Sequence, residues 1–107
     1  MPKNHPIPPL STIHDIVTRW AARHDARVEG CPPALDHWLV RPANAPDGGT
    51  ICVALRHNEH GPLEVAPSND RGWFERYGTT PRELPRILDL ARADVFSWSG
   101  DPGQGMP

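Results

Sequence analysis

Prolines divide this chain into short segments. Fourteen of the 107 residues are proline and nine are glycine, and most of them lie at the ends of the chain or between apolar runs. A proline inside a helix or a central strand removes a backbone hydrogen bond. The folded elements must therefore lie between these positions, and a chain of this length has room for one hydrophobic core.

Both ends of the chain are poor in apolar residues. Residues 1–9 contain four prolines, and residues 99–107 contain three glycines and two prolines. Neither segment can bury enough apolar surface to offset the entropy that ordering would cost. We therefore expect a flexible proline-rich tail at 1–9, a single domain at 10–98 and a flexible glycine- and proline-rich tail at 99–107.

The clearest helical pattern follows the first tail. Ser11 or Thr12 can act as its N-cap, and Gly30 follows the last residue of the pattern. Residues at helical spacing form one apolar stripe about 140° wide. These residues are Ile13, Ile16, Val17, Trp20, Ala21, His24 and Val28. The pattern predicts one helix that ends just before Gly30 and packs on a sheet.

Three later segments have the features of strands: residues 36–41, 50–57 and 63–66. In the second segment two kinds of residue alternate, Ile51, Val53 and Leu55 against Cys52, Ala54 and Arg56. Glycines in the two connecting segments favour tight turns. The sequence therefore predicts an antiparallel meander of three strands.

A second helix is predicted before the C-terminal tail. Thr80 and Glu83 have the spacing of a capping box, and Pro85 limits the start of regular helix to its own neighbourhood. The apolar face of this helix comprises Leu84, Ile87, Leu88, Ala91 and Val95. Residues 73–78 predict a short helical turn before it, and Phe96 and Trp98 a short fourth strand after it. The predicted fold class is α+β, with both helices on one face of the sheet.

Composition excludes several classes of protein. No segment approaches the 18 consecutive apolar residues of a membrane-spanning helix, and the N-terminus has no apolar run typical of a signal peptide. Cys31 and Cys52 are too few for a disulfide framework. We therefore expect a cytoplasmic protein with reduced thiols.

The side chains that usually carry catalysis lack the required arrangement. Cys52, His57 and His60 have a spacing that zinc accepts, with Cys31 and His37 as further candidates. However, Cys52 and His57 point to opposite faces of one regular strand. We therefore expect no metal, no cofactor and no catalytic residue, and a small metal- or histidine-dependent enzyme is the second alternative.

Two further side chains are expected to have structural roles. Cys52 lies between Ile51 and Val53, and an apolar setting raises the pKa of a thiol and leaves it inert. His24 lies in the apolar stripe of the first helix, so we expect it to be half-buried with one ring nitrogen bonded to a neighbour.

Arginine and tryptophan supply the candidate partner-binding residues. Arg19, Arg23 and Arg27 have the spacing of one helix face, and Asp15 is placed to pair with Arg19. Trp38 and Trp73 adjoin predicted loops, and tryptophan and arginine are typical of interface hot spots. In a chain with little Phe and Tyr, a core position is the favoured interpretation of each tryptophan, and an exposed partner-binding position is the alternative. The leading hypothesis is a non-catalytic regulatory protein (an inhibitor, immunity-type factor, chaperone or adaptor) that binds a protein partner through these residues.

The first alternative is a nucleic-acid or anion-binding module that uses the same arginines. Ten of the eleven basic residues are arginine, whose guanidinium group suits phosphates and carboxylates. Against this alternative, the formal net charge is −2, whereas generic nucleic-acid binders are usually basic.

Overall fold

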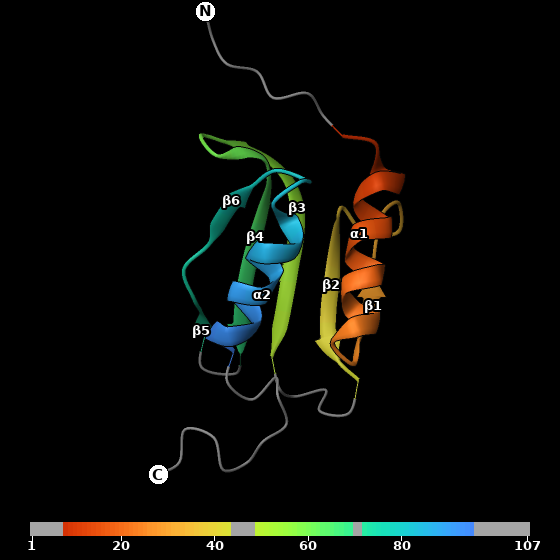
Figure 1. Ribbon diagram of the computed structural model, residues 1–107, viewed down its shortest axis with the longest axis vertical. Helices are drawn as coiled ribbons and strands as arrows, with labels where there is room; N and C mark the ends of the chain where they lie inside the picture. The colour runs from red at the N-terminus through yellow and green to blue at the C-terminus, as the bar shows by residue number, and fades with distance from the viewer. Residues whose placement is uncertain (1–7, 44–48, 70–71, 96–107) are drawn as a thin grey trace, which may run out of the picture.

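The computed structural model describes residues 8–43, 49–69 and 72–95, with the side chain of Trp73 excepted (Figure 1). The elements in chain order are α1 (Leu10–Arg23), β1 (Ala26–Gly30), β2 (His37–Pro42), β3 (Thr50–Asn58), β4 (Gly61–Asn69), β5 (Gly72–Trp73), β6 (Tyr77–Thr79) and α2 (Leu84–Asp94). The expected tails, apart from Pro8 and Pro9, and the expected strand at Phe96 and Trp98 lie outside these residues. Neither α1 nor α2 is long and apolar enough to span a bilayer.

The six strands form one antiparallel sheet, and the fold class is α+β as predicted. Strands β1, β2, β3 and β4 are neighbours in that order, and β5 and β6 both pair with β4. The three predicted strands correspond to β2, β3 and β4. The predicted number of strands was wrong, because β1, β5 and β6 were missed. The helical turn predicted at 73–78 is also wrong, because β5 and β6 occupy half of that segment and the residues 74–76 between them are not helical.

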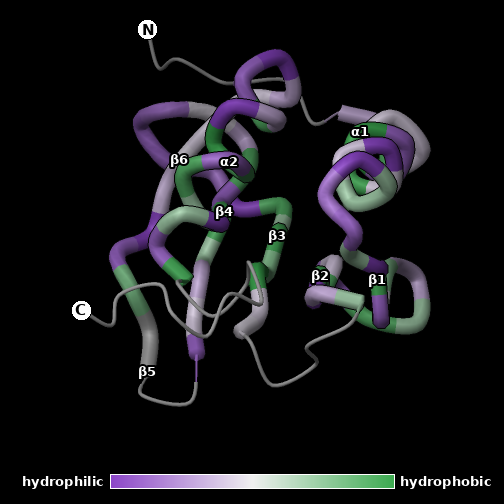
Figure 2. The backbone as a smooth tube through the Cα atoms, turned by 60° about the horizontal axis from the view of Figure 1, so that its bottom comes forward, coloured by the Kyte–Doolittle hydropathy of each residue, from purple (hydrophilic) through white to green (hydrophobic). Residues whose placement is uncertain are grey.

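One face of the sheet forms the core with both helices. Trp38 lies opposite Val53, and Val53 lies opposite Val65, so alternating residues of three strands meet on this face. Figure 2 shows α1 and α2 on this same side of the sheet, α1 over β1 and β2, α2 over β3 and β4. The helices contribute Ile13, Val17, Trp20, Ala21, Leu84, Ile87, Leu88 and Ala91 to the core.

Helix α1 is shorter than predicted. It ends at Arg23, and Asp25 then adopts a positive φ of 54°, a conformation that Asp tolerates better than most residues. The chain reverses there, and Val28, predicted to be helical, lies in β1 opposite Val40. The expected N-cap is also wrong, because the helix begins at Leu10 and no side chain caps it.

Helix α2 begins where Pro85 required. A turn precedes it, in which the Thr80 hydroxyl accepts a hydrogen bond from the backbone N–H of Glu83 at 3.3 Å. The Glu83 carboxylate does not complete a capping box, because it accepts a hydrogen bond from Arg86 Nε at 2.9 Å. Regular helix then runs from Leu84 with a proline in its first turn.

The strand beyond β4 is interrupted at Pro67. Trp73 of β5 lies opposite Ser68, and Tyr77 of β6 lies opposite Val65. The outer chain therefore uses one residue more than β4 between these two pairs. Pro67 has no N–H to donate, although its carbonyl accepts a hydrogen bond from Phe74 N at 3.0 Å. Two short strands result in place of one long edge strand.

Candidate functional site

Four of the five candidate partner-binding residues predicted from the sequence have described side chains, and these four do not form one surface. Arg19 and Arg23 lie on α1, and Arg19 Nε is 3.2 Å from the Asp15 carboxylate as predicted. Arg27 lies in β1, so the predicted row of three arginines on one helix does not exist. Trp38 is fully buried, and Trp73 lies in β5 with its side chain outside the described part.

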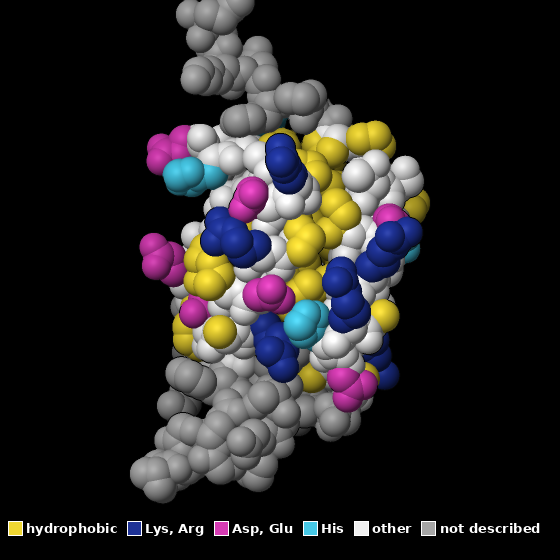
Figure 3. All heavy atoms as spheres, viewed as in Figure 1, with side chains coloured by type: hydrophobic (Ala, Val, Ile, Leu, Met, Phe, Trp, Pro, Cys, Tyr) yellow, Lys and Arg dark blue, Asp and Glu magenta, His cyan; other side chains and the backbone are white. Residues whose placement is uncertain are grey.

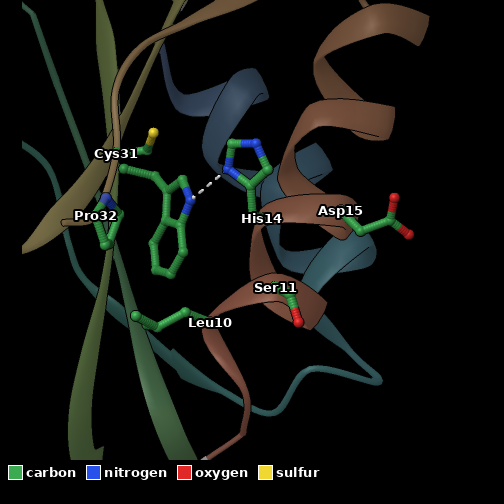
Figure 4. Close-up of a pocket in the computed structure, with 7 residues that line it drawn as sticks. Leu10, Ser11, His14, Asp15, Cys31 and Pro32 are labelled. Atoms are coloured by element: carbon green, nitrogen blue, oxygen red, sulfur yellow. Dashed lines mark hydrogen bonds between the residues drawn. The ribbon is translucent and has the colours of Figure 1, made fainter. Parts of the chain in front are cut away.

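Trp38 forms one wall of an open pocket between α1 and β2 (Figure 4). The pocket has a volume of about 450 Å³, and its lining comprises Leu10, Ser11, His14, Asp15, Cys31, Pro32 and Trp38. Trp38 donates its Nε1–H to His14 Nδ1 at 3.3 Å. Neutral His14 therefore carries its proton on Nε2.

The polar residues of this pocket do not form a catalytic group. Figure 4 shows Ser11 and Asp15 pointing away from the His14 ring. The Asp15 carboxylate accepts a hydrogen bond from Arg19, and His14 Nδ1 accepts one from Trp38. A nucleophile and a base within hydrogen-bond reach of each other are needed for covalent catalysis, and the Asp15 carboxylate and His14 Nδ1 are engaged elsewhere.

Another group of polar contacts joins α1 to α2. Asp89 Oδ1 accepts a hydrogen bond from Trp20 Nε1 at 2.9 Å and lies 3.4 Å from His24 Nε2. The His24 ring packs on Trp20 with a centroid distance of 4.3 Å. Burial, followed by the charge of Arg92, lowers the pKa of His24, while Asp89 opposes this shift. The predicted packing role of His24 is confirmed, and Asp89 is the neighbour that the sequence could not name.

These contacts lie along the seam where α1 and α2 meet at the protein surface. Figure 3 shows apolar side chains along this seam and arginines on both sides of it. His24 keeps 27% of its side-chain surface exposed, and Asp89 keeps 59%. The histidine and its carboxylate therefore lie at the surface and not in a deep cleft.

The structure also places the cysteines and histidines that the sequence raised as metal ligands. Among the described residues, no three His, Cys, Asp or Glu side chains gather closely enough to hold a metal ion. Burial raises the pKa of the Cys52 thiol, and the carboxylates of Asp36 and Glu64 add to this shift. The raised thiol pKa predicted for Cys52 is therefore confirmed.

The sheet face opposite the two helices is called the open face below, because neither α1 nor α2 covers it. A row of apolar residues crosses its centre: Leu39 lies opposite Cys52, and Cys52 lies opposite Ala66. Ala54 lies two residues along β3 from Cys52, on the same face. Solvent-facing sides of antiparallel sheets are usually polar, so an apolar centre here is a departure that marks a candidate binding surface.

Two ion-pair clusters lie beside this apolar row. In the first, the Glu29 carboxylate lies 3.1 Å from Arg27 Nε and 3.5 Å from Arg41 Nε. Arg41 Nε also donates a hydrogen bond to the Thr50 hydroxyl at 3.1 Å. We call Arg27, Glu29 and Arg41 the first cluster.

The second cluster comprises Arg56, Glu64 and Arg76. Glu64 Oε1 lies 3.3 Å from Arg56 Nη1 and 3.4 Å from Arg76 Nη1. Both clusters thus place one glutamate between two arginines. Sequence reasoning missed them because their members come from different strands, although the alternation of Arg56 with Ile51, Val53 and Leu55 already assigned it to the outer face.

Comparison with protein-family models, with curated proteins and with solved structures gives no match to this chain. The candidate site therefore rests on the geometry of the open face.

Proposed function

We propose that this protein is a small non-catalytic interaction protein, of the inhibitor, immunity-type, chaperone or adaptor kind, that binds a protein partner on its open face. The observation that carries the proposal is the apolar row between two clusters rich in arginine, in which Leu39 and Cys52 are partly exposed and Ala66 keeps 8% of its surface exposed. Protein interfaces combine an apolar centre with a polar rim, and arginine is enriched in them. A cytoplasmic partner is part of this proposal.

The proposal moves the binding surface from the α1 face to the open face. Among the side chains that the structure describes, Arg27 is common to the surface expected from the sequence and to the open face. Trp38 supports the sheet from its buried side, because it lies opposite Val53 in the core. Arg19 and Arg23 remain on α1 and serve as a natural control surface.

A single bulky substitution at the centre of the open face tests the proposal. Ala54 lies opposite Glu64 in the register, so Ala54→Arg introduces a long side chain beside a carboxylate that can pair with it. Ala22 is exposed on α1, and Ala22→Arg is the matched control. The partner would be identified by cross-linking a tagged copy in its native host, and then purified for binding measurements.

We expect Ala54→Arg to weaken binding of the purified partner at least about tenfold, which corresponds to about 1.4 kcal/mol, while Ala22→Arg leaves it unchanged. Equal binding by the wild type and Ala54→Arg would contradict the proposal. Release of the partner by nuclease would instead support a nucleic-acid-binding module.

A further inference from the structure

We infer that the segment bound on the open face is an amphipathic α-helix with acidic residues along both flanks, held by the first and second clusters. This inference rests on the proposed function, because it names the partner chemistry of the same face. It is carried by the positions and charges of the two clusters.

The two clusters lie on opposite sides of the apolar row. Arg41 is level with Thr50 of β3, to which it donates a hydrogen bond, whereas Glu64 is level with Ala54. From Arg41 to Glu64 the sheet advances two strands and four residues, a separation of about 16 Å at ordinary sheet spacings. An α-helix with its side chains is about 10–12 Å wide. A helix lying on the apolar row would therefore bring its two flanks to the two clusters.

The small side chains of the row allow a close approach. Cys52 of the row and its neighbour Ala54 are partly exposed at the middle of β3, Ala66 on β4 keeps only 8% of its surface exposed, and Leu39 is the one large side chain of the row. Partner side chains of moderate size, such as alanine and leucine, can fill the space above them. The contact would remove apolar surface from water on both sides, which is the main favourable contribution to most associations.

The net positive charge of each cluster favours acidic residues on the flanks of the partner helix. Each cluster sets two guanidinium groups against one carboxylate, and the contacts of Arg27 and Arg56 with their glutamates each use one of five N–H donors. The side chains of Arg27 and Arg56 keep 56% and 62% of their surface exposed. Aspartate or glutamate on the partner helix can therefore form charge-assisted hydrogen bonds with them.

Other occupants fit the face less well. A second copy of this chain, packed face to face, would bring arginine-rich clusters against each other. A nucleic acid would gain nothing from the apolar row and would meet Glu29 and Glu64 at the centres of the clusters. A peptide strand adds to the edge of a sheet and not to its face.

Three designed peptides of about 15 residues, or about four helical turns, test the inference. All share one stripe of alanine and leucine. The first carries glutamate on both flanks, the second glutamine and the third lysine. Binding to the full chain would be measured by fluorescence anisotropy, and the contacted residues would be mapped from backbone amide shifts in NMR spectra.

We expect the glutamate peptide to bind at least about tenfold more tightly than the glutamine peptide, and the lysine peptide not to bind. Raising the salt concentration from about 0.1 M to about 1 M shortens the screening length from about 10 Å to about 3 Å, so it should remove this preference. Amide shifts should be confined to β2, β3 and β4. Failure of all three peptides to bind, equal binding by them, or shifts confined to α1 and α2 would overturn the inference.

A matched pair of double variants identifies the charges responsible. Arg27→Gln with Arg56→Gln removes one arginine from each cluster, and Arg19→Gln with Arg23→Gln removes the same charge from α1. We expect the first pair to weaken the glutamate peptide about tenfold and the second to leave it within about twofold. Equal effects of the two pairs would overturn the inference.

Binding of the natural partner distinguishes a failure of this inference from a failure of the proposed function. If Ala54→Arg abolishes its binding and the Arg27 and Arg56 double variant does not, the open face binds a partner but not through acidic flanks. If neither change affects its binding, the proposed function fails as well. A short DNA duplex that displaces the glutamate peptide would show a general preference for polyanions and would also overturn the inference.

Discussion

Trp38 links the buried core to a side chain at the protein surface. Its ring is fully buried, yet its Nε1–H must find an acceptor, and His14 on α1 supplies one. A buried donor that loses its partner costs the protein the full desolvation of that group. The position of α1 over β2 therefore depends on an imidazole nitrogen as well as on apolar packing.

Replacing His14 tests this dependence. We expect His14→Ala to lower the free energy of unfolding by about 1–3 kcal/mol, because Trp38 Nε1–H is left without its acceptor. His14→Asn places an amide oxygen near the position of Nδ1 and should recover part of the loss, although Asn is the poorer helix former. Urea unfolding of the three proteins measures the difference. Equal stability of the Ala variant and the wild type would contradict this role.

His24 makes the stability of the protein depend on pH. Burial and Arg92 lower its pKa below the usual 6.5 in the folded state, against the opposing effect of Asp89. As the pH falls through 6.5, the unfolded chain takes up a proton at this residue before the folded protein does, so acid favours unfolding. The stability contributed by neutral His24 is therefore complete above that pH and is lost below it.

The variant His24→Phe keeps a ring beside Trp20 and removes the titrating group. We expect the free energy of unfolding to fall less between about pH 7.5 and pH 5 in this variant than in the wild type. Urea unfolding of both proteins at the two pH values gives the change in the free energy of unfolding for each protein. An unchanged pH dependence would show that His24 is not responsible.

The ends of elements are fixed by contacts that join one element to another. β6 and α2 are an example, because the Tyr77 hydroxyl donates a hydrogen bond to Asp94 Oδ2 at 2.5 Å. This hydrogen bond, with burial and the charge of Asp94, raises the pKa of Tyr77 to about 12. β6 has only three residues, so this contact helps to hold it against the last turn of α2.

Tyr77 is the only tyrosine of the chain, so its titration can be read directly. We expect its ultraviolet absorbance to change with a midpoint near 12, and Asp94→Asn to lower that midpoint toward 10. Between these values the folded protein keeps a proton that the unfolded chain releases, so raising the pH through this range favours unfolding. A wild-type midpoint at 10 would show that the hydrogen bond does not form.

Element boundaries show where sequence patterns become ambiguous. Ala26, Val28 and Gly30 alternate with polar residues, which suits a strand, but Val28 also continues the helical spacing of α1. The turn at Asp25, with its positive φ, and the pairing of β1 with β2 decide between the two. Local spacing favoured the longer helix because it cannot include that pairing.

For the molecule as a whole, apolar periodicity predicted the α+β class, the three central strands and the face that each residue of β3 presents. It also assigned Trp20 to the core correctly. It could not supply the register between strands, which alone brings Arg41 level with Thr50 or Glu64 level with Ala54. The two clusters were therefore beyond reach of sequence reasoning, as was the loss of Arg27 from the α1 surface.

The break at Pro67 has a consequence for how the protein behaves in crowded solution. A long, straight outer strand offers its free backbone groups to any passing chain, and such edges seed aggregation. Here the edge beside β4 consists of two short strands, β5 with two residues and β6 with three, whose registers are offset by one position. A strand of another molecule cannot pair with this edge over its whole length in one register. This edge of the sheet is therefore protected from polymerisation by strand addition.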